Sequence, residues 1–105
     1  MPDPTQGGQG YEVHGSQQIV EDFRRVQRQA AAEGRGEQAL SAVKRIYRQL
    51  QQHPTDAGEP AYRLPGLRMQ VRTIVIRPLV VDYAVCEDRP IVFIKGVKLL
   101  PAPRR

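Results

Sequence analysis

The apolar residues of this chain are densest in two stretches near its C-terminal end, residues 79–86 and 91–100. Both stretches are rich in β-branched and aromatic side chains, and a short turn segment, residues 87–90, separates them. Two runs of this composition joined by a short loop are typical of a β-hairpin. Because Pro90 has no backbone N–H to donate to a strand ladder, we place it in the loop, which is expected to close on a Cys86–Ile91 pair.

Pairing the two strands outward from this loop gives the hairpin one apolar face. The pairs expected on that face are Tyr83–Ile94, Val85–Val92 and Val81–Gly96. The pairs expected on the opposite face are Asp82–Lys95 and Ala84–Phe93. A shift of one residue would move the apolar side chains to the wrong face, so the pattern favours this register. The opposite charges of Asp82 and Lys95 would stabilise the hairpin by about 0.2–1 kcal/mol.

A third strand is expected over residues 67–76, immediately before the hairpin. Its first half alternates between an apolar and a polar set, which are Leu67, Met69 and Val71, and Arg68, Gln70 and Arg72. The polar set is predicted to point away from the core. Residues 11–14 alternate over a shorter length and favour an edge strand that joins the same sheet. Residues 55–66 hold two prolines and two glycines and are expected to form an extended loop.

Two helices are expected before these strands. The first follows Ser16, a residue type that caps helix N-termini, and ends near Glu33, where glycines begin. The second covers residues 36–52 and ends before Pro54, which disfavours helical geometry in the residue preceding it. Their apolar stripes are Ile19, Phe23, Val26 and Ala30, and Leu40, Val43, Ile46, Tyr47 and Leu50. A short glycine-containing link between two such helices predicts an antiparallel helical hairpin.

The order of these elements predicts an α+β fold, in which the helical hairpin packs on a three- to four-stranded antiparallel sheet. We expect a single domain over residues 11–100. Residues 1–10 are rich in Pro, Gly and Gln and offer nothing to bury, which predicts a disordered N-terminal tail. Residues 101–105 are expected to be a frayed basic C-terminal tail.

The charge balance of the 105 residues favours an anionic partner. There are 16 Lys and Arg against 11 Asp and Glu, a formal net charge of +5. Such an excess is typical of proteins that bind a polyanion or an acidic protein, and a basic protein with no nucleic-acid role is the alternative. The single cysteine, Cys86, excludes an internal disulfide framework and fits a reducing compartment. With neither a membrane-spanning apolar run nor a signal peptide, the expected location is the cytoplasm, with no membrane partner.

Metal and cofactor chemistry has little support in this sequence. His14, His53 and Cys86 are far apart and match no metal-ligand spacing, so no metal is expected. The glycines of residues 7–10 follow no strand and precede no helix, so they are not expected to form a phosphate-binding loop, and no cofactor is expected.

Basic residues of the strand-forming half are the one set with a clear chemical use. They are Arg63, Arg68, Arg72, Arg77, Lys95 and Lys98. If Arg68 and Arg72 project from the same side as Lys95, the three form a cationic patch on the uncovered face of the sheet. Such a patch would hold backbone phosphates, or stabilise the pentavalent phosphate of RNA cleavage. The alternative is a solvated polar face. Tyr83 is a candidate proton donor for this site, although the register favours a place in the core.

The same residues resemble the RelE/ParE superfamily of toxins from bacterial type II toxin–antitoxin systems. The resemblance lies in the helical pair with its Leu50-x-x-x-Pro54-x-x-x-Gly58 exit, Leu67-Arg68, Val80-x-x-Tyr83-x-Val85, and the strand from Ile91 to Lys95. It covers nearly all of the chain between residues 11 and 100. It implies the α+β fold already described, and either cleavage of messenger RNA on the ribosome or inhibition of DNA gyrase, silenced by a small antitoxin.

Together with the basic residues of the strand half, this resemblance makes Arg68, Arg72 and Lys95 the candidate catalytic residues, and Arg63, Arg77 and Lys98 the candidate nucleic-acid contacts. Arg68 matches the arginine that begins the first meander strand of the superfamily, and Lys95 matches a basic residue of its last strand. The ribosome-dependent nucleases keep a His or Tyr in or after that last strand, whereas residues 96–101 have neither.

Three functional hypotheses therefore remain open. The chain is a toxin-type protein acting as an endoribonuclease on messenger RNA, or a translation inhibitor, with an antitoxin and RNA or the ribosome as partners. Alternatively it is a catalytically inactive interaction module of the same fold, whose sheet edge or helical groove receives a peptide from a partner, or it is a gyrase inhibitor. The uncovered sheet edges are compatible with a monomer or a homodimer.

Overall fold

The computed structural model of the chain describes residues 10–102. The expected disordered tail over residues 1–10 therefore falls outside the described residues except for Gly10. Of the expected frayed end over residues 101–105, only Pro101 and Ala102 are described, and both are exposed and outside any helix or strand.

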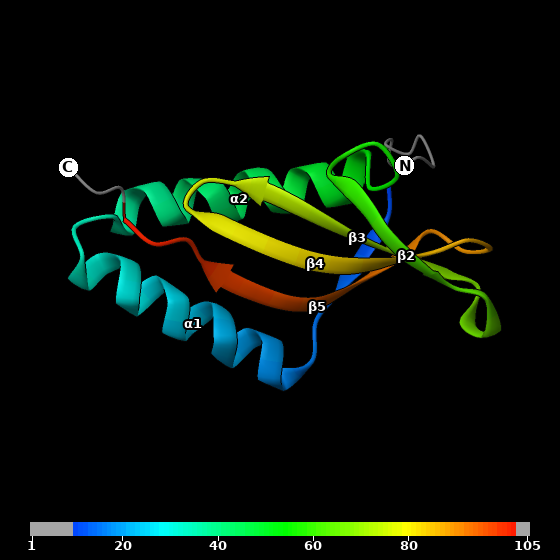
Figure 1. Ribbon diagram of the computed structural model, residues 1–105, viewed down its shortest axis with the longest axis horizontal. Coiled ribbons are helices and arrows are strands. Elements are labelled where there is room, and N and C mark those ends of the chain that lie inside the picture. Colours follow the sequence, from blue (N-terminus) through cyan, green and yellow to red (C-terminus); the bar gives the residue numbers. More distant parts are fainter. Residues whose placement is uncertain (1–9, 103–105) are drawn as a thin grey trace, which may run out of the picture.

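The helical layer has the predicted boundaries. Helix α1 (Gln17–Ala32) begins after Ser16, whose hydroxyl accepts a hydrogen bond from the Ile19 N–H at 3.2 Å. It ends before Gly34, whose φ of 76° lies in the left-handed region that glycine adopts without strain. Helix α2 (Gly36–Gln52) then returns alongside α1 (Figure 1). The predicted helical hairpin is thus confirmed.

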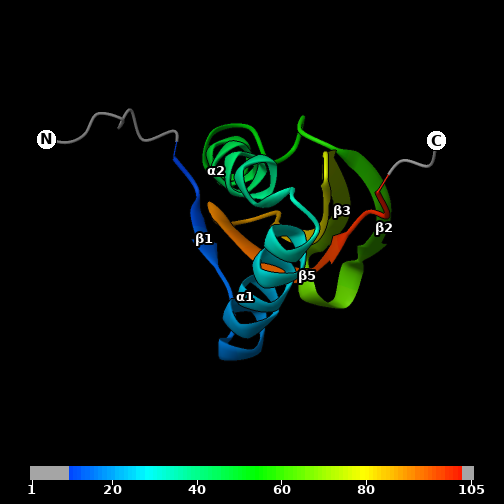
Figure 2. The same cartoon turned by 90° about the vertical axis from the view of Figure 1, so that its left-hand side faces the viewer.

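The sheet is larger than expected and is mixed rather than purely antiparallel. Its five strands are β1 (Glu12–His14), β2 (Glu59–Leu64), β3 (Met69–Ile76), β4 (Leu79–Cys86) and β5 (Ile91–Leu99). Their order across the sheet is β1-β5-β4-β3-β2, and β1 runs parallel to β5 while the other neighbours are antiparallel. The helices lie on one side of this sheet, and Figure 2 shows β1 and β2 at its two opposite edges.

Strand β2 lies within the segment that was expected to be a loop. Its proline is tolerated because β2 is an edge strand, which has one side that makes no ladder hydrogen bonds. A β-bulge between Pro60 and Tyr62 also interrupts its pairing with β3. A short 3-10 helix, η1 (Pro65–Leu67), then leads into β3.

The register of the central hairpin is confirmed close to the loop and wrong beyond it. Tyr83–Ile94, Ala84–Phe93 and Val85–Val92 pair as expected. A bulge then leaves Lys95 without a partner strand residue, so that Asp82 pairs with Gly96 and Val81 with Val97. The expected pairs Asp82–Lys95 and Val81–Gly96 do not form. The extra residue places Val97 on the core side of the sheet. Without the bulge, the regular alternation of side chains after Ile94 would have placed Val97 on the opposite side.

The residues of β3 face the opposite sides of the sheet from those that the sequence predicts. Residues paired across strands share a face, and Arg72 and Ile74 pair with Tyr83 and Val81 of the core. Gln70, Arg72, Ile74 and Ile76 therefore face the helices, whereas Val71 faces the uncovered side. The apolar alternation of the first half of the strand was misleading because Ile74 and Ile76, at the opposite parity, meet the main core.

The core lies between the helical hairpin and the sheet. The largest side chains without solvent exposure are Tyr83, Ile46, Leu50, Leu79, Val81, Val92 and Pro54. Among residues 10–102 no helix is long and apolar enough to cross a lipid bilayer.

Candidate functional site

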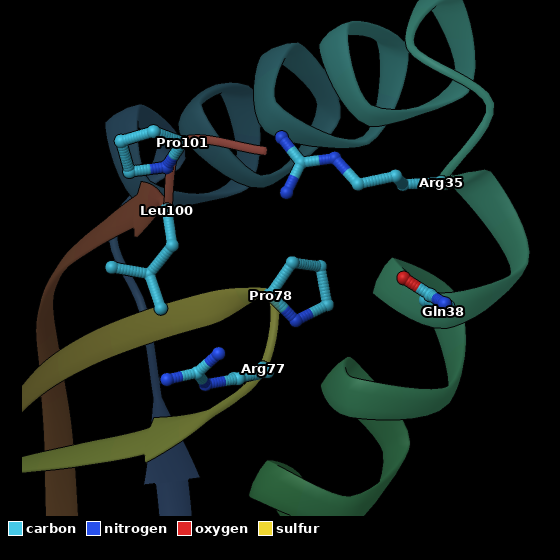
Figure 3. Close-up of a pocket in the computed structure, with 6 residues that line it drawn as sticks. All are labelled: Arg35, Gln38, Arg77, Pro78, Leu100 and Pro101. Carbon is cyan, nitrogen blue, oxygen red and sulfur yellow. The ribbon is translucent and has the colours of Figure 1, made fainter. Parts of the chain in front are cut away.

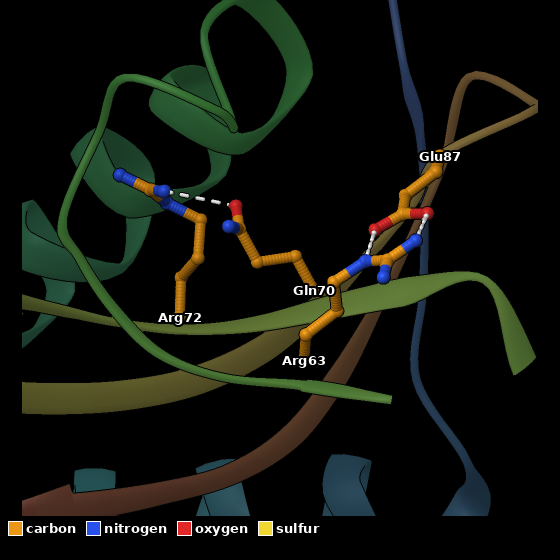
Figure 4. A network of polar contacts seen from close by, with 4 residues as sticks. All are labelled: Arg63, Gln70, Arg72 and Glu87. Carbon is orange, nitrogen blue, oxygen red and sulfur yellow. Dashed lines mark hydrogen bonds and ion pairs between the residues drawn. The ribbon is translucent and has the colours of Figure 1, made fainter. Parts of the chain in front are cut away.

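Arg72, one of the three expected catalytic residues, is buried on the helix side of the sheet. Only 7% of its surface is exposed, and its guanidinium donates to the Gly58 carbonyl at 2.9 Å and to the Gln70 side-chain oxygen at 3.0 Å (Figure 4). These bonds join β3 to the segment that follows α2. The hypothesis that Arg68, Arg72 and Lys95 share one exposed patch is therefore wrong, because Arg72 points into the protein.

Tyr83 lies in the core, as the register predicted. Its hydroxyl is hydrogen-bonded to the Pro54 carbonyl oxygen at 2.8 Å and the Ala57 carbonyl oxygen at 3.2 Å. Burial raises the pKa of this phenol, against the opposing effect of the nearby Arg72 guanidinium. The neutral phenol is the form that donates to a carbonyl, so Tyr83 fixes the segment after α2 to the sheet.

Arg63, an expected nucleic-acid contact, forms a two-bond ion pair with Glu87. Its Nε and one terminal nitrogen lie 2.5 and 2.7 Å from the two carboxylate oxygens (Figure 4). The ion pair lowers the pKa of the Glu87 carboxyl and raises the pKa of the Arg63 guanidinium, mainly through these two hydrogen bonds. The bonds tie β2 to the turn between β4 and β5, so the charge of Arg63 is already compensated within the protein.

The other four expected residues are exposed, and they come from three places, the corner before β3, strand β5 and the turn between β3 and β4. Arg68 sits at the corner before β3 with a φ of 53°, and its carbonyl accepts from the Glu87 N–H at 2.9 Å. Lys95 occupies the bulge of β5, and Lys98 pairs with Val80 farther along that strand. Arg77 lies in the turn between β3 and β4.

The centre of the uncovered sheet face is apolar rather than cationic. Tyr62, Val71, Ala84 and Phe93 lie in cross-strand register on β2 to β5. The Phe93 ring lies 5.6 Å from the ring of His14, between centroids. A pattern of charges alternating with apolar residues therefore does not identify which face of this sheet is polar.

An exposed apolar groove lies on the helical hairpin. Its lining includes Ile19, Val20, Phe23, Leu40, Val43 and Tyr47, and its volume is about 350 Å³. Val20, Leu40 and Tyr47 remain 40%, 47% and 37% exposed. We define this set of residues as the helix groove.

The width of the apolar stripe on α2 indicates the helix groove. The expected stripe of α2 joined Leu40, Val43 and Tyr47 to Ile46 and Leu50, which is wider than the side that the sheet covers. In the structure Ile46 and Leu50 are fully buried against the sheet, while Leu40 and Tyr47 face outward.

Basic residues border the helix groove. Arg24 lines it, and Lys44 and Arg48 lie within one helical turn of Leu40 or Tyr47 on α2. Lys44 and Arg48 are exposed, and neither forms an ion pair with a residue between 10 and 102. The groove therefore combines an apolar floor with a positive border. Within the described range, no three His, Cys, Asp or Glu side chains cluster in a way that suits a metal ion.

Comparison with known proteins gives a likeness in fold. No protein-family model matches the chain. No curated protein matches it either. Among solved structures, it is similar to a chain from the chromosomal ParDE TA system from P. aeruginosa, with a TM-score of 0.61 and 17% sequence identity. The match covers 90% of this chain and 100% of that chain. The α+β arrangement expected from the sequence is therefore confirmed, and it is shared with a chain of a ParDE system.

Proposed function

We propose that this chain is a ParE-type toxin whose helix groove receives a segment of an antitoxin protein. The observation that carries the proposal is the exposed apolar groove on a fold that is similar to a ParDE chain over nearly its whole length. Contiguous exposed apolar surface bordered by charge is typical of protein interaction sites.

The groove favours an amphipathic helix with acidic residues beside its apolar positions. Leu40, Val43 and Tyr47 are spaced at i, i+3 and i+7 on α2, so a helix laid beside them would bury all three. Lys44 and Arg48 would then face the border of the bound helix, where carboxylates complement them. The net charge of +5 favours the same kind of partner.

The target of the toxin is inferred from what the exposed residues allow. Ribosome-dependent cleavage of messenger RNA, the first hypothesis from the sequence, retains only Arg68 and Lys95 of its three expected catalytic residues, because Arg72 is buried and bonded. Inhibition of DNA gyrase, which the resemblance of the sequence to the RelE/ParE superfamily implies, requires binding without a catalytic set. We therefore place gyrase inhibition first and RNA cleavage second.

Expression of the chain in a bacterial host separates these functions. Gyrase inhibition predicts growth arrest, and loss of supercoiling when purified chain is added to gyrase and relaxed plasmid. RNA cleavage predicts growth arrest with fragmented transcripts and unchanged supercoiling. Unchanged growth, supercoiling and transcripts would contradict both and leave the inactive interaction module.

Binding to the helix groove is tested with a synthetic amphipathic helix that carries leucines at positions i, i+3 and i+7 and glutamates beside them, which is the kind of segment that the groove favours. Leu40→Ser should not disturb the core, because Leu40 is 47% exposed. The substitution removes the part of this side chain that a bound helix would cover. Burying a leucine contributes about 1.5–3 kcal/mol, so we expect the dissociation constant to rise about tenfold. Val75→Ser is the matched control, since Val75 is 54% exposed and belongs to the sheet. Equal affinities of the two variants would contradict the assignment of the groove.

A further inference from the structure

No helix of residues 10–102 covers the face of the sheet opposite α1 and α2, although the centre of that face is apolar (Figure 2). One cross-strand row on this face passes through β5, β4, β3 and β2 and consists of Phe93, Ala84, Val71 and Tyr62. Val71 and Ala84 are each only 2% exposed, so neighbouring side chains of the same face cover them. Phe93 and Tyr62, at the two ends, remain 36% and 54% exposed. We call these four residues the apolar row.

A second row on the same face, beside the apolar row, is polar. Asp82 of β4 pairs with Thr73 of β3, and Thr73 pairs with Glu59 of β2. At the bulge of β5, Lys95 and Gly96 together oppose Asp82, which brings the Lys95 side chain to the β5 end of this row. Lys95 and Glu59 are exposed, and neither forms an ion pair with a residue between 10 and 102. The polar row therefore has a cation at its β5 end and an anion at its β2 end.

The two rows are complementary to a second copy of themselves. A two-fold axis parallel to the strands, midway between β3 and β4, places β5 of one copy against β2 of the other. Lys95 of each copy then faces Glu59 of the other, and the two apolar rows meet. A two-fold axis across the strands would not give this match, because it would set the polar row against the row that contains the pair of Met69 and Cys86.

We propose that the chain forms a weak two-fold dimer through this face, with ion pairs between Lys95 of one copy and Glu59 of the other. Two twisted sheets pack in this way about 10 Å apart in β-sandwiches. Four strands spaced about 4.8 Å apart and about 26 Å long give each copy a contact of roughly 500 Å². The total of about 1,000 Å² is the lower bound for a specific interface, so we expect a dissociation constant in the micromolar range.

The dimer is independent of the function proposed above. The helix groove lies on the helices, which cover the opposite face of the sheet, so both grooves of the dimer stay open. Self-association is measured on the chain alone, without a groove ligand, gyrase or RNA. Failure of the dimer would therefore leave the proposed toxin function standing, and failure of that function would leave the dimer standing.

The first test is the mass of the full chain in solution. Sedimentation equilibrium at low salt would cover chain concentrations from about 1 μM to about 1 mM, the range in which a weak interface of this size associates. We expect the average mass to rise from the 11.8 kDa of one chain toward twice that value. A chain that remains monomeric throughout would overturn the proposal.

Charge reversal tests the arrangement of the two copies. Lys95→Glu and Glu59→Lys each set like charges against one another at both borders, so each is expected to raise the dissociation constant about tenfold. The double variant restores opposite charges across the dimer and is expected to return the constant to within about threefold of the native value. Two strands separate Lys95 from Glu59 within one copy, so the restoration cannot come from a pair inside the chain. Both side chains are exposed, and circular dichroism would show that the variants keep the fold.

Arg77→Glu is the matched control for the loss of positive charge. Arg77 is exposed at the turn between β3 and β4, and Figure 3 shows it beside a hollow that it lines together with Arg35 and Gln38 of the helical hairpin. The variant makes the same change of charge as Lys95→Glu, away from the proposed interface, and we expect the native dissociation constant. Equal weakening by Arg77→Glu and Lys95→Glu, or a double variant no tighter than the single variants, would overturn the proposal.

Discussion

Replacing Tyr83 by phenylalanine removes one oxygen atom and isolates the contribution of its hydroxyl. Tyr83 has no solvent exposure, so water cannot replace the bonds to the carbonyls of Pro54 and Ala57. The phenyl ring fills the same space, so no large cavity forms. Leaving a buried acceptor unpaired costs about 1–3 kcal/mol.

That cost can be measured by urea unfolding followed by circular dichroism. With a typical slope of about 1–3 kcal/mol per molar urea, we expect the unfolding midpoint of Tyr83→Phe to fall by roughly 1 M. Tyr62→Phe is the matched control, because Tyr62 is 54% exposed, and its free energy of unfolding should stay within about 0.5 kcal/mol of the native chain. If the two variants are equally stable, the role assigned to the buried hydroxyl is refuted.

The raised pKa of Tyr83 gives the same variant a second signature. Above about pH 10 the tyrosine of the unfolded chain loses its proton, whereas the buried phenol keeps it. The folded state then binds more protons than the unfolded state, so stability falls as the pH rises through this range. The difference in stability between the native chain and Tyr83→Phe should therefore be constant below pH 10 and narrow above it, as urea unfolding at several pH values can show.

Two further predictions concern the segment that Tyr83 and Arg72 hold and the ion pair between Arg63 and Glu87. Gly58→Ala should lower the free energy of unfolding by more than about 1–2 kcal/mol, since Gly58 has a φ of 84° and a Cβ there would lie 2.4 Å from the Thr73 carbonyl oxygen. Gly66→Ala, where a Cβ meets nothing within 4 Å, should leave it nearly unchanged in the same unfolding assay. Glu87→Gln should destabilise the chain at neutral pH and low salt, because its pKa is lowered by Arg63, and the loss should disappear as the pH falls through that lowered pKa or as salt is added. Equal losses at low and high salt would contradict the last of these.

The helices and the turn end of the central hairpin were predictable because their signals are local. The Ser16 cap, Gly34 and Pro54 fix the ends of both helices through contacts within a few residues. The pairing of Tyr83 with Ile94 follows from the adjacent loop. In each case the interaction that fixes the structure lies within the same short segment of the sequence.

The predictions were wrong where contacts between distant segments of the chain decide the structure. The bulge at Lys95 brings Val97 to the core, and its one local sign is Gly96, an isolated glycine within a strand. Strand β2 exists because the free edge of β3 accepts it, although its own sequence has the composition of a loop. Arg72 faces inward because the carbonyl of Gly58 and the amide of Gln70 are there to receive it. The sequence shows these groups but not that they meet.

The arginines of this chain differ in the groups that surround them. These groups decide which of the guanidinium charges are available to a binding partner. Arg72 is bound to a buried carbonyl and Arg63 to Glu87, so two of the cations counted toward a nucleic-acid patch on the sheet are already engaged. Arg45 and Arg77, which have no carboxylate partner within residues 10–102, lie instead beside the helical hairpin. An exposed charge without a partner keeps more of its field than one in a bidentate pair, so Arg45 and Arg77 attract an approaching anion more strongly than Arg63 or Arg72 does. The helix groove lies on the same helical hairpin.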